Sequence, residues 1–308
     1  MPLPEAFHEV ARNVNNWGRW GDDDQIGTLN LITDDVVRAA VATVRSGRRI
    51  ALSLPISSEG PQAGLVPGRD NPVLDVFSVN ESLIGDPERF ASSDDRMHLA
   101  LQSGTHWDGL AHVSWDGRLY NGFGAGVVTP TGADRLGIHN VTSLVSRGVL
   151  LDLPLALGVD RLEAGHLVTP EDLDLAEAIS DVRVRAGDIV LLRTGQMQHF
   201  HAGDRVAYAF PSPGPGMDCA RWFHQRDVAA VATDTLAFEV FPCELDDVFL
   251  PVHLLHLVEM GMTQGQNWDL EALAADCADD GQYDFLLTAN PEPIVGGVGA
   301  PVAAVAIK

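Results

Sequence analysis

The sequence predicts an α/β domain with a mixed central β-sheet flanked by helices. Short runs of apolar and β-branched residues are typical of buried strands. Segments that begin with helix-capping residues lie between these runs, and such an alternation indicates an α/β fold. The expected strands span residues 50–56, 149–153, 188–193, 228–233 and 302–307, and the expected helices span about 33–47, 169–179, 218–226, 249–261 and 270–277.

The chain length is compatible with a single domain. At 308 residues, one hydrophobic core can still serve the whole chain. No internal repeat or linker divides the sequence, so we expect one domain over residues 1–308, with an N-terminal Trp- and Gly-rich arm at about residues 1–32. Residues 57–96 are rich in Pro, Gly and Asp, which indicates a long excursion of the kind that often shapes a pocket.

Charge and composition exclude several classes of partner. The formal net charge is −23, and a surface so acidic repels phosphate backbones and anionic lipids, so we expect neither nucleic acid nor membrane as a partner. No apolar run approaches the length of a membrane-spanning helix, and the N-terminus lacks the pattern of a targeting signal. A cytoplasmic protein is therefore expected. Its three widely spaced cysteines predict neither a zinc site nor a disulfide framework.

The segment from Gln102 to His112 concentrates polar, ligand-type residues. If a strand continues through it, Gln102, His106 and Asp108 project from one face, because the side-chain period along a strand is two. In a helix His106 and Asp108 would diverge by about 200°. The strand interpretation therefore gathers groups suited to chemistry on a single face.

Two glycines in this segment favour a functional site. Gly104 leaves room for a substrate or metal between the polar side chains, and Gly109 permits a turn that returns His112 to the same point. Two imidazoles and a carboxylate at this spacing suit metal binding or general acid–base catalysis. The alternative is a hydrogen-bonded core histidine at 106, a turn-capping Asp108 and a half-exposed His112.

Aromatic and cationic residues near these motifs have two interpretations each. Trp20, Trp107 and Trp115 could line a pocket for an aromatic substrate, or they could fill the core. Arg193, at the end of an apolar strand, could bind a substrate carboxylate or form a structural ion pair.

The order Gly104-Thr105-His106-x-Asp108-x-x-x-His112 resembles the pattern H-x-G-T-H-x-D-x-x-x-H of the cyclase family of kynurenine formamidase-like and isatin hydrolase-like metal-dependent hydrolases. The resemblance covers nearly the whole chain and implies a swivelling β/β/α fold. Further segments that match in family order are Trp20-Gly21, residues 27–30, Tyr120-Asn121-Gly122, residues 147–152, Gly187-Asp188, residues 193–195, Asp234, Glu239, His253 and residues 296–301.

This resemblance also implies roles for single residues. Family members that hydrolyse amides hold a divalent metal, Mn or Zn, so the match implies His106, Asp108 and His253 as metal ligands together with Gln102. It implies His112 as general acid or base, and a homodimer or higher homo-oligomer. Gln102 and Gln266 occupy positions where the pattern has histidine and glutamate, and a neutral amide is a weak ligand for transition metals.

The sequence therefore leaves three hypotheses open. The first is a cyclase-family enzyme that acts on a carbonyl, imine, lactam or amide carbon of a small cyclic substrate by acid–base chemistry of His106, Asp108 and His112, without metal. In it, Gln102, Gln266 and His253 help to bind the substrate, and the reaction is hydrolysis, dehydration or cyclisation. The second is a Mn- or Zn-dependent amidohydrolase of the kynurenine formamidase type, and the third is a non-catalytic homologue that binds a small molecule.

Overall fold

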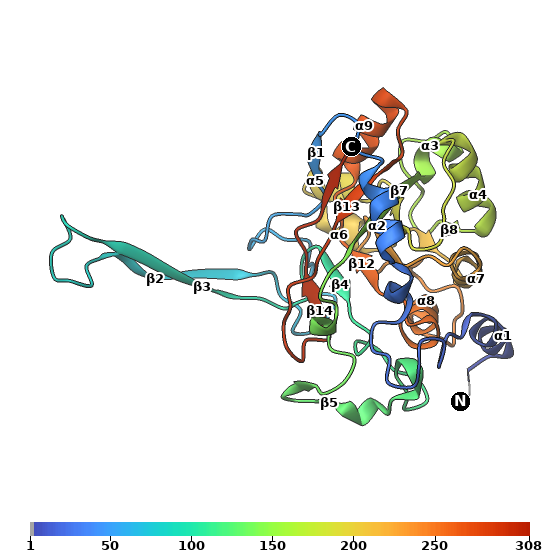
Figure 1. Ribbon diagram of the computed structural model, residues 1–308, viewed down its shortest axis with the longest axis horizontal. Coiled ribbons are helices and arrows are strands. Elements are labelled where there is room, and N and C mark those ends of the chain that lie inside the picture. Colours follow the sequence, from blue (N-terminus) through green and yellow to red (C-terminus); the bar gives the residue numbers. More distant parts are fainter. Residues whose placement is uncertain (1–2) are drawn as a thin grey trace.

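A curled, mixed β-sheet of nine strands forms the centre of the molecule, and helices flank it (Figure 1). The computed structural model describes residues 3–308. The expected α/β fold with a mixed sheet is thereby confirmed. In spatial order the strands are β1 (Arg49–Ala51), β15 (Val305–Ile307), β13 (Asp284–Thr288), β7 (Val145–Asp152), β9 (Ile189–Arg193), β11 (Ala230–Thr233), β12 (Gln264–Gln266), β4 (His106–Asp108) and β14 (Gly299–Pro301).

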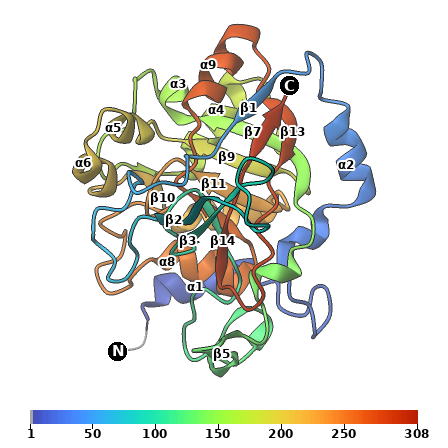
Figure 2. The same ribbon diagram turned by 90° about the vertical axis from the view of Figure 1, so that its left-hand side faces the viewer.

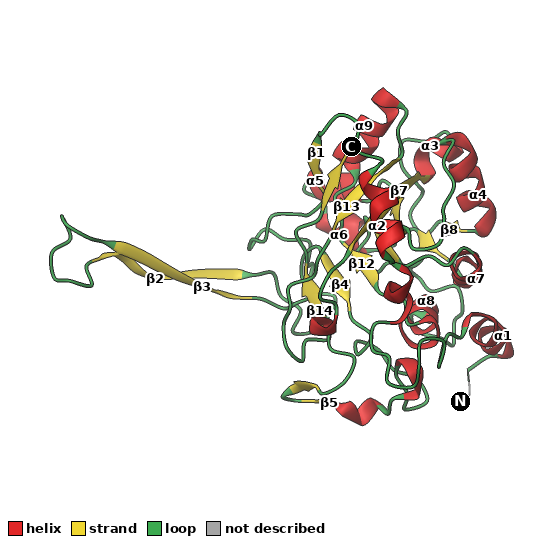
Figure 3. Ribbon diagram, in the orientation of Figure 1, coloured by secondary structure: helices red, strands yellow, loops and turns green. Residues whose placement is uncertain are grey.

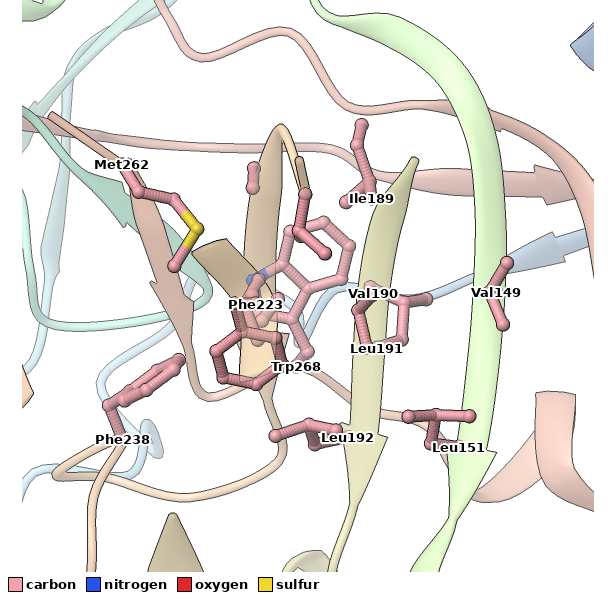
Figure 4. Packing of buried hydrophobic residues seen from close by; sticks show 14 of the residues in the cluster. Val149, Leu151, Ile189, Val190, Leu191, Leu192, Phe223, Phe238, Met262 and Trp268 are labelled. Atoms are coloured by element: carbon pink, nitrogen blue, oxygen red, sulfur yellow. The ribbon is translucent and has the colours of Figure 1, made fainter. Parts of the chain in front are cut away.

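The middle of the sheet is parallel and the two ends are antiparallel. β7, β9, β11 and β12 pair in parallel, whereas every other neighbouring pair is antiparallel. Parallel strands are covered on both faces, so they consist of continuous apolar residues rather than alternating ones. In β9, Ile189 to Leu192 are fully buried and pack beside Val149 and Leu151 of β7 on one side and toward Phe223 and Trp268 on the other (Figure 4).

Local capping signals place the helices near their expected positions (Figure 3). The side chain of Thr33 caps α2, and Thr169 forms a capping box with Asp172 at the start of α4. The first helix, α1, was not predicted. The α-helices are α1 (Glu5–Val14), α2 (Asp34–Val41), α3 (Leu153–Leu157), α4 (Pro170–Ile179), α5 (Met197–His201), α6 (Arg205–Ala209), α7 (Met217–Gln225), α8 (Pro251–His253) and α9 (Glu271–Asp280).

The helix expected at 249–261 is irregular. α8 contributes a single turn and continues directly into a π-helical segment, η5 (Leu254–Met260), which ends at Gly261 in the left-handed conformation. π-helical turns are uncommon and often lie at functional sites. Within residues 3–308 no helix is long and apolar enough to span a membrane.

Residues 73–98 form a hairpin that projects from the body of the molecule (Figure 1). Its strands, β2 (Val73–Glu81) and β3 (Ser92–His98), pair antiparallel with two register shifts. Figure 2 looks along this β2–β3 hairpin, which is seen end-on in front of the sheet. The expected long excursion over residues 57–96 is therefore confirmed, and its outer part is a hairpin rather than a loop. Three small pairings complete the strands: β2 with β3, β5 (Val128–Thr129) with β6 (Gly132–Ala133), and β8 (Leu167–Val168) with β10 (Gly214–Pro215).

Near one end of the sheet, polar residues lie on one face and the other face packs into the hydrophobic core. In β4 the side chains alternate, so Trp107 points away from its two polar neighbours. The indole of Trp107 packs edge-on against Trp268, with ring centroids 4.9 Å apart, and its Nε1 donates to the carbonyl of Ala289. The two rings fit because Gly265, opposite Trp107 in β12, has no side chain.

Replacing Gly265 with alanine should destabilise the protein. An added Cβ would lie 2.5 Å from Nε1 of Trp268 and 2.8 Å from Cβ of Ala232, and overpacking of this kind costs about 1–3 kcal/mol. Urea unfolding of Gly265→Ala measures the loss. Gly126→Ala is the matched control, since an added Cβ there meets nothing within 4 Å. Equal stabilities of the two variants would contradict the packing argument.

Candidate active site

β4 presents His106 and Asp108 on one face of the sheet, as the period-two argument predicted. Both side chains are fully buried. Gln102 does not belong to this strand, because residues 99–105 form turns rather than an extended segment. The expectation of one strand from Gln102 through Asp108 was therefore wrong for residues 102–105, and Gln102 reaches the site by another route.

The turn after Asp108 returns His112 to the carboxylate. The amide of His112 donates to the carbonyl of Gly109, which closes the turn. Nε2 of His112 then lies 3.6 Å from Oδ1 of Asp108, and Nε2 of His106 lies 3.4 Å from the same oxygen. Two imidazoles thus converge on one carboxylate oxygen.

A third imidazole approaches from α8. Nε2 of His253 lies 3.9 Å from Oδ2 of Asp108. Its Nδ1 lies 2.6 Å from Oε1 of Glu239, and the carboxylate of Glu239 also accepts the backbone amides of Val252 and His253. A carboxylate can only accept from the ring, so Nδ1 of His253 carries a proton. Glu239 therefore fixes both the position and the tautomer of His253.

Gln266 joins two of these groups from the neighbouring strand. In the β12–β4 pairing Gln266 lies opposite His106, so its side chain shares the face of the site. Its Nε2 donates to Oδ2 of Asp108 at 2.5 Å and lies 3.4 Å from Nε2 of His253. Both neighbours present lone pairs, which assigns the NH₂ end of the amide to this position.

Backbone contacts fix the tautomer of His106. Its Nδ1 lies 2.8 Å from the carbonyl oxygen of Gly104, which can only accept, so Nδ1 carries the proton. The same carbonyl accepts a hydrogen bond from the amide of Asn267. Nε2 of His106 and Oδ1 of Asp108 have no hydrogen-bond partner within residues 3–308. Two lone pairs thus face the interior of the site.

The electrostatics favour an ionised carboxylate beside a neutral base. Burial by itself raises the pKa of Asp108, but His112, His106 and His253 outweigh that effect when they are protonated and lower the pKa of the carboxyl group. Burial lowers the pKa of His112, against the attraction of Asp108. At neutral pH His112 is therefore unprotonated, which is the state that a general base requires.

Gln102 lies above the same face. Its Nε2 lies 2.7 Å from where a Cβ on Gly299 would be, and Gly299 pairs directly with Asp108 across β14 and β4. Paired residues share a face, so the amide of Gln102 lies over the side of the sheet that carries Asp108. This Nε2 is buried and has no hydrogen-bond partner among the described residues. It is an available donor at the site.

A cavity of about 720 Å³ opens beside these residues. Its wall is mainly apolar, and His253 is the site residue that borders it. Trp115 lines it, with Nε1 bound to Oε1 of Glu259. The other lining residues are Leu3, His8, Val113, Ser114, Asp116, Val248, Phe249, Leu250 and Leu254. A cavity of this size and polarity suits a small organic molecule.

The side chains present do not match a metal centre. Within residues 3–308 no three His, Cys, Asp or Glu side chains are arranged to hold a metal ion. The amide NH₂ of Gln266 donates to Oδ2 of Asp108 and faces His253, so donor hydrogens occupy the Oδ2 side of the carboxylate. Two neutral amides, Gln102 and Gln266, complete the surroundings, and they are poor ligands for Mn or Zn.

Two of the predicted substrate-binding residues lie elsewhere. Trp107 is fully buried on the opposite face of β4, where it packs in the core. The guanidinium of Arg193 binds the carboxylates of Glu271 and Asp152, so its charge is already paired within the protein. Both expectations are corrected to structural roles.

The predicted role of Trp20 is also unsupported by its place in the structure. The ring of Trp20 lies 4.7 Å from the guanidinium of Arg19 and is not part of the cavity wall. Among the three tryptophans considered, Trp115 is the one that borders the cavity. Glu239 was the residue that sequence reasoning missed: it appeared only as a matching position before His253, and nothing local linked the two.

His256, one turn after His253, is a core residue. It is fully buried between Phe238 and Phe223, and its Nδ1 lies 3.2 Å from Oε1 of Gln264. Burial lowers the pKa of His256 to about 3. This imidazole is therefore neutral in the folded protein and belongs to the packing under the site.

The family model described as "Putative cyclase" matches residues 50–240. A crystal structure of a novel cyclase is 36% identical to this chain, with a TM-score of 0.87 over 97% of this chain and 99% of the other. The chain belongs to the cyclase family. No curated protein matches it.

More distant solved structures share the fold. An isatin hydrolase bound to the product analogue thioisatinate and isatin hydrolase A from Ralstonia solanacearum are each 20% identical. Each has a TM-score of 0.62, over 84% of this chain and 91% of the other. A predicted metal-dependent hydrolase from Bacillus stearothermophilus is 16% identical, with a TM-score of 0.54 over 84% and 97%. At this identity the similarity supports the fold alone.

The neutral state of His256 predicts a loss of stability in acid. Folding lowers the pKa of His256. Below about pH 6.5 this imidazole is therefore protonated in the unfolded chain but stays neutral in the folded protein. Stability should fall from that pH downward, by about 2 kcal/mol at pH 5 from this residue alone. Urea unfolding of wild type and His256→Gln at pH 7 and pH 5 tests this. The variant should show a pH difference smaller by that amount, and an unchanged difference would refute the assignment.

Proposed function

We propose that this protein is an enzyme that adds water to, or removes it from, an electrophilic carbon of a small cyclic substrate by His/Asp acid–base chemistry. The observation that carries the proposal is the buried Asp108 carboxylate with three imidazoles around it, one of them the partly exposed His112. A fully buried charge with that many titratable neighbours is costly, and such arrangements cluster at functional sites. The reacting carbon is a carbonyl, imine, lactam or amide carbon.

In hydrolysis, neutral His112 acts as the base. Its Nε2 accepts a proton from water while the water oxygen attacks the substrate carbon. The imidazolium that forms is stabilised by Asp108, and it returns the proton to the leaving nitrogen as the carbon–nitrogen bond breaks. The reverse order of the same transfers gives cyclisation with loss of water.

Gln102 is the group that we assign to the substrate oxygen. Its unpartnered Nε2 is buried on the face of Asp108, where a hydrogen bond to a carbonyl oxygen would strengthen as negative charge develops. Nδ1 of His106 donates to the carbonyl of Gly104. Its Nε2 lone pair therefore faces the site, where we assign it to accept a hydrogen bond from a donor group of the substrate. Gln266 and Glu239 keep Asp108 and His253 in place.

We infer that Gln102 and Gln266 replace two metal ligands of kynurenine formamidase-type relatives. The amide of Gln266 donates to Asp108 where a carboxylate would repel it, so the carboxylate is stabilised by hydrogen bonds instead of by a cation. Acid–base chemistry alone suits activated substrates such as strained lactams or imides better than unactivated amides.

His112→Ala should lower turnover by about 10²–10⁴-fold, because loss of a positioned general base has that effect. A panel of small lactams, cyclic imides and formamides, with isatin included because structural neighbours carry that name, identifies a substrate by its change in absorbance. His199→Ala, on α5, is the control for loss of a half-exposed histidine. Equal turnover in His112→Ala and wild type would refute the assigned base.

A metal-dependent amidohydrolase is the second candidate, and one observation favours it. Nε2 of His106 and Oδ1 of Asp108 lie 3.4 Å apart, both without partners among the described residues, and two such lone pairs attract a cation. Stoichiometric manganese or zinc in the purified protein would establish this candidate. Activity that survives chelation would exclude it.

Gln266→Glu should convert the site toward metal binding. A second carboxylate beside Asp108 cannot ionise without a compensating cation, and it supplies the ligand that the amide cannot. Elemental analysis after dialysis against manganese or zinc should therefore find more bound metal in Gln266→Glu than in wild type. Gln225→Glu, at an exposed position of α7, adds the same charge away from the site and is the control. Equal metal contents in Gln266→Glu and wild type would contradict the replacement argument.

The third candidate is a homologue that binds a small molecule without converting it, and the same panel of compounds tests it. A compound that shifts the melting temperature without being converted, in wild type as in His112→Ala, would support it. Conversion by the wild type excludes it.

A further inference from the structure

Arg69 differs from the other unpaired arginines of the chain. Of the 19 arginines, eleven form an ion pair with a carboxylate and eight do not. Seven of these eight are exposed, whereas Arg69 is half-buried. Its guanidinium forms no salt bridge and no hydrogen bond to any residue from 3 to 308. A cation that is partly removed from water and unpaired is unusual in a chain with 43 acidic residues.

The loop that carries Arg69 is held beside the candidate active site. Nε2 of Gln62 donates to the carbonyl of Ser103 at 2.8 Å, and this contact is buried. The two ends of the loop bind each other: the amide of Gln62 donates to Oδ1 of Asn71 at 3.0 Å, and Nδ2 of Asn71 donates to the carbonyl of Gln62 at 3.1 Å. Residues 62–71 therefore form a closed loop whose base contacts the turn that precedes β4.

The side chain of Arg69 lies against the body of the molecule, close to His112. Its neighbours Gly68 and Asp70 are exposed, whereas Arg69 is half-buried. Burial is the largest cause that lowers the pKa of His112, and the positive charge of Arg69 adds to it. A charge acts in this way at short range, because salt and water screen it over about 10 Å. The guanidinium is therefore near the one imidazole of the site that is partly exposed to solvent.

A lone guanidinium in this place suits a carboxylate. Arginine presents a planar fork of N–H donors that binds the two oxygens of a carboxylate in parallel, and such charge-assisted pairs are strong. The net charge of −23 repels anionic molecules from most of the surface. An acidic ligand therefore needs a local positive charge at the site, and Arg69 supplies one.

We propose that Arg69 binds a carboxylate group of the substrate, so that the substrate is a small cyclic amide, imide or imine with an acidic substituent. This inference rests on the proposed function for the reacting part of the molecule, and it adds a second point of attachment. Gln102 binds the reacting oxygen, and Arg69 binds the carboxylate. Two attachments orient the ring relative to the base, His112, which one attachment cannot do. Arg69 is thus a specificity-determining residue.

Binding is the first test, and it does not require turnover. Calorimetric titration at low salt compares 2-pyrrolidone, dihydrouracil and isatin, each with and without a ring carboxylate. For at least one pair, wild type should bind the acidic member more tightly, and Arg69→Gln should weaken that binding by about 10–100-fold, because a charge-assisted pair is lost. The control is Arg45→Gln, which removes an exposed, unpaired arginine before β1, near the other end of the sheet. A wild type without preference for any acidic member, or a preference that survives in Arg69→Gln, overturns the proposal.

Stability and kinetics separate substrate binding from other roles of Arg69. Since the guanidinium has no partner in the described chain, Arg69→Gln should unfold at the same urea concentration as wild type, and a clear loss of stability would assign a structural role instead. For a converted acidic substrate, Arg69→Gln should raise KM by about 10–100-fold, and kcat/KM for the neutral member should stay within about twofold. An equal loss for both members overturns the proposal, because Arg69 would then act through His112. Arg69-dependent binding of acidic compounds that are never converted supports this inference and contradicts the proposed reaction alone.

Discussion

Asp108 places a carboxylate where water does not reach, and the arrangement of the site follows from the cost of that charge. An unpaired buried charge is too costly for a marginally stable protein. One donated hydrogen bond, from Gln266 of β12, stabilises the carboxylate, and three imidazoles that can share its charge when protonated surround it: His106 from the same strand, His112 from the following turn and His253 from α8. Each comes from a different part of the chain, so the carboxylate links the end of the sheet to the helical layer.

The sheet can accommodate this charge because one of its faces is polar at β4 and the other packs into the hydrophobic core. On one face of β4, His106 and Asp108 meet the glutamines of β12. On the other face, Trp107 and Trp268 pack into the core and hold the strand in place. Gly265 makes that packing possible, and Gly299 leaves space for Gln102. The precision of the polar face thus depends on apolar contacts of residues that never touch a substrate.

The sequence predicts what depends on local physics and misses what depends on distance. Thr33 and Thr169 predict the starts of helices, because a capping side chain binds a backbone amide within the next four residues. His106, Asp108 and His112 are predictable because strand alternation and one glycine turn bring them together. Gln102 breaks the pattern, since the strand does not extend back to it. Glu239 reaches His253 across 14 residues of irregular chain, and no local period encodes that contact. The β2–β3 hairpin was not predicted, because its register shifts and its two apolar faces remove the apolar–polar alternation that is typical of a half-buried strand.

The terminal group of the side chain at position 266, an amide or a carboxylate, determines how the buried charge of Asp108 is balanced. With an amide there, the NH₂ end donates to Asp108 at 2.5 Å and faces the lone pair of His253. With a carboxylate in the same place, two negative oxygens would lie within hydrogen-bond distance, and one would have to take up a proton or share a cation. The fold is indifferent to this choice, because both side chains have the same shape. The choice at position 266 therefore changes the charge of the site without changing the scaffold.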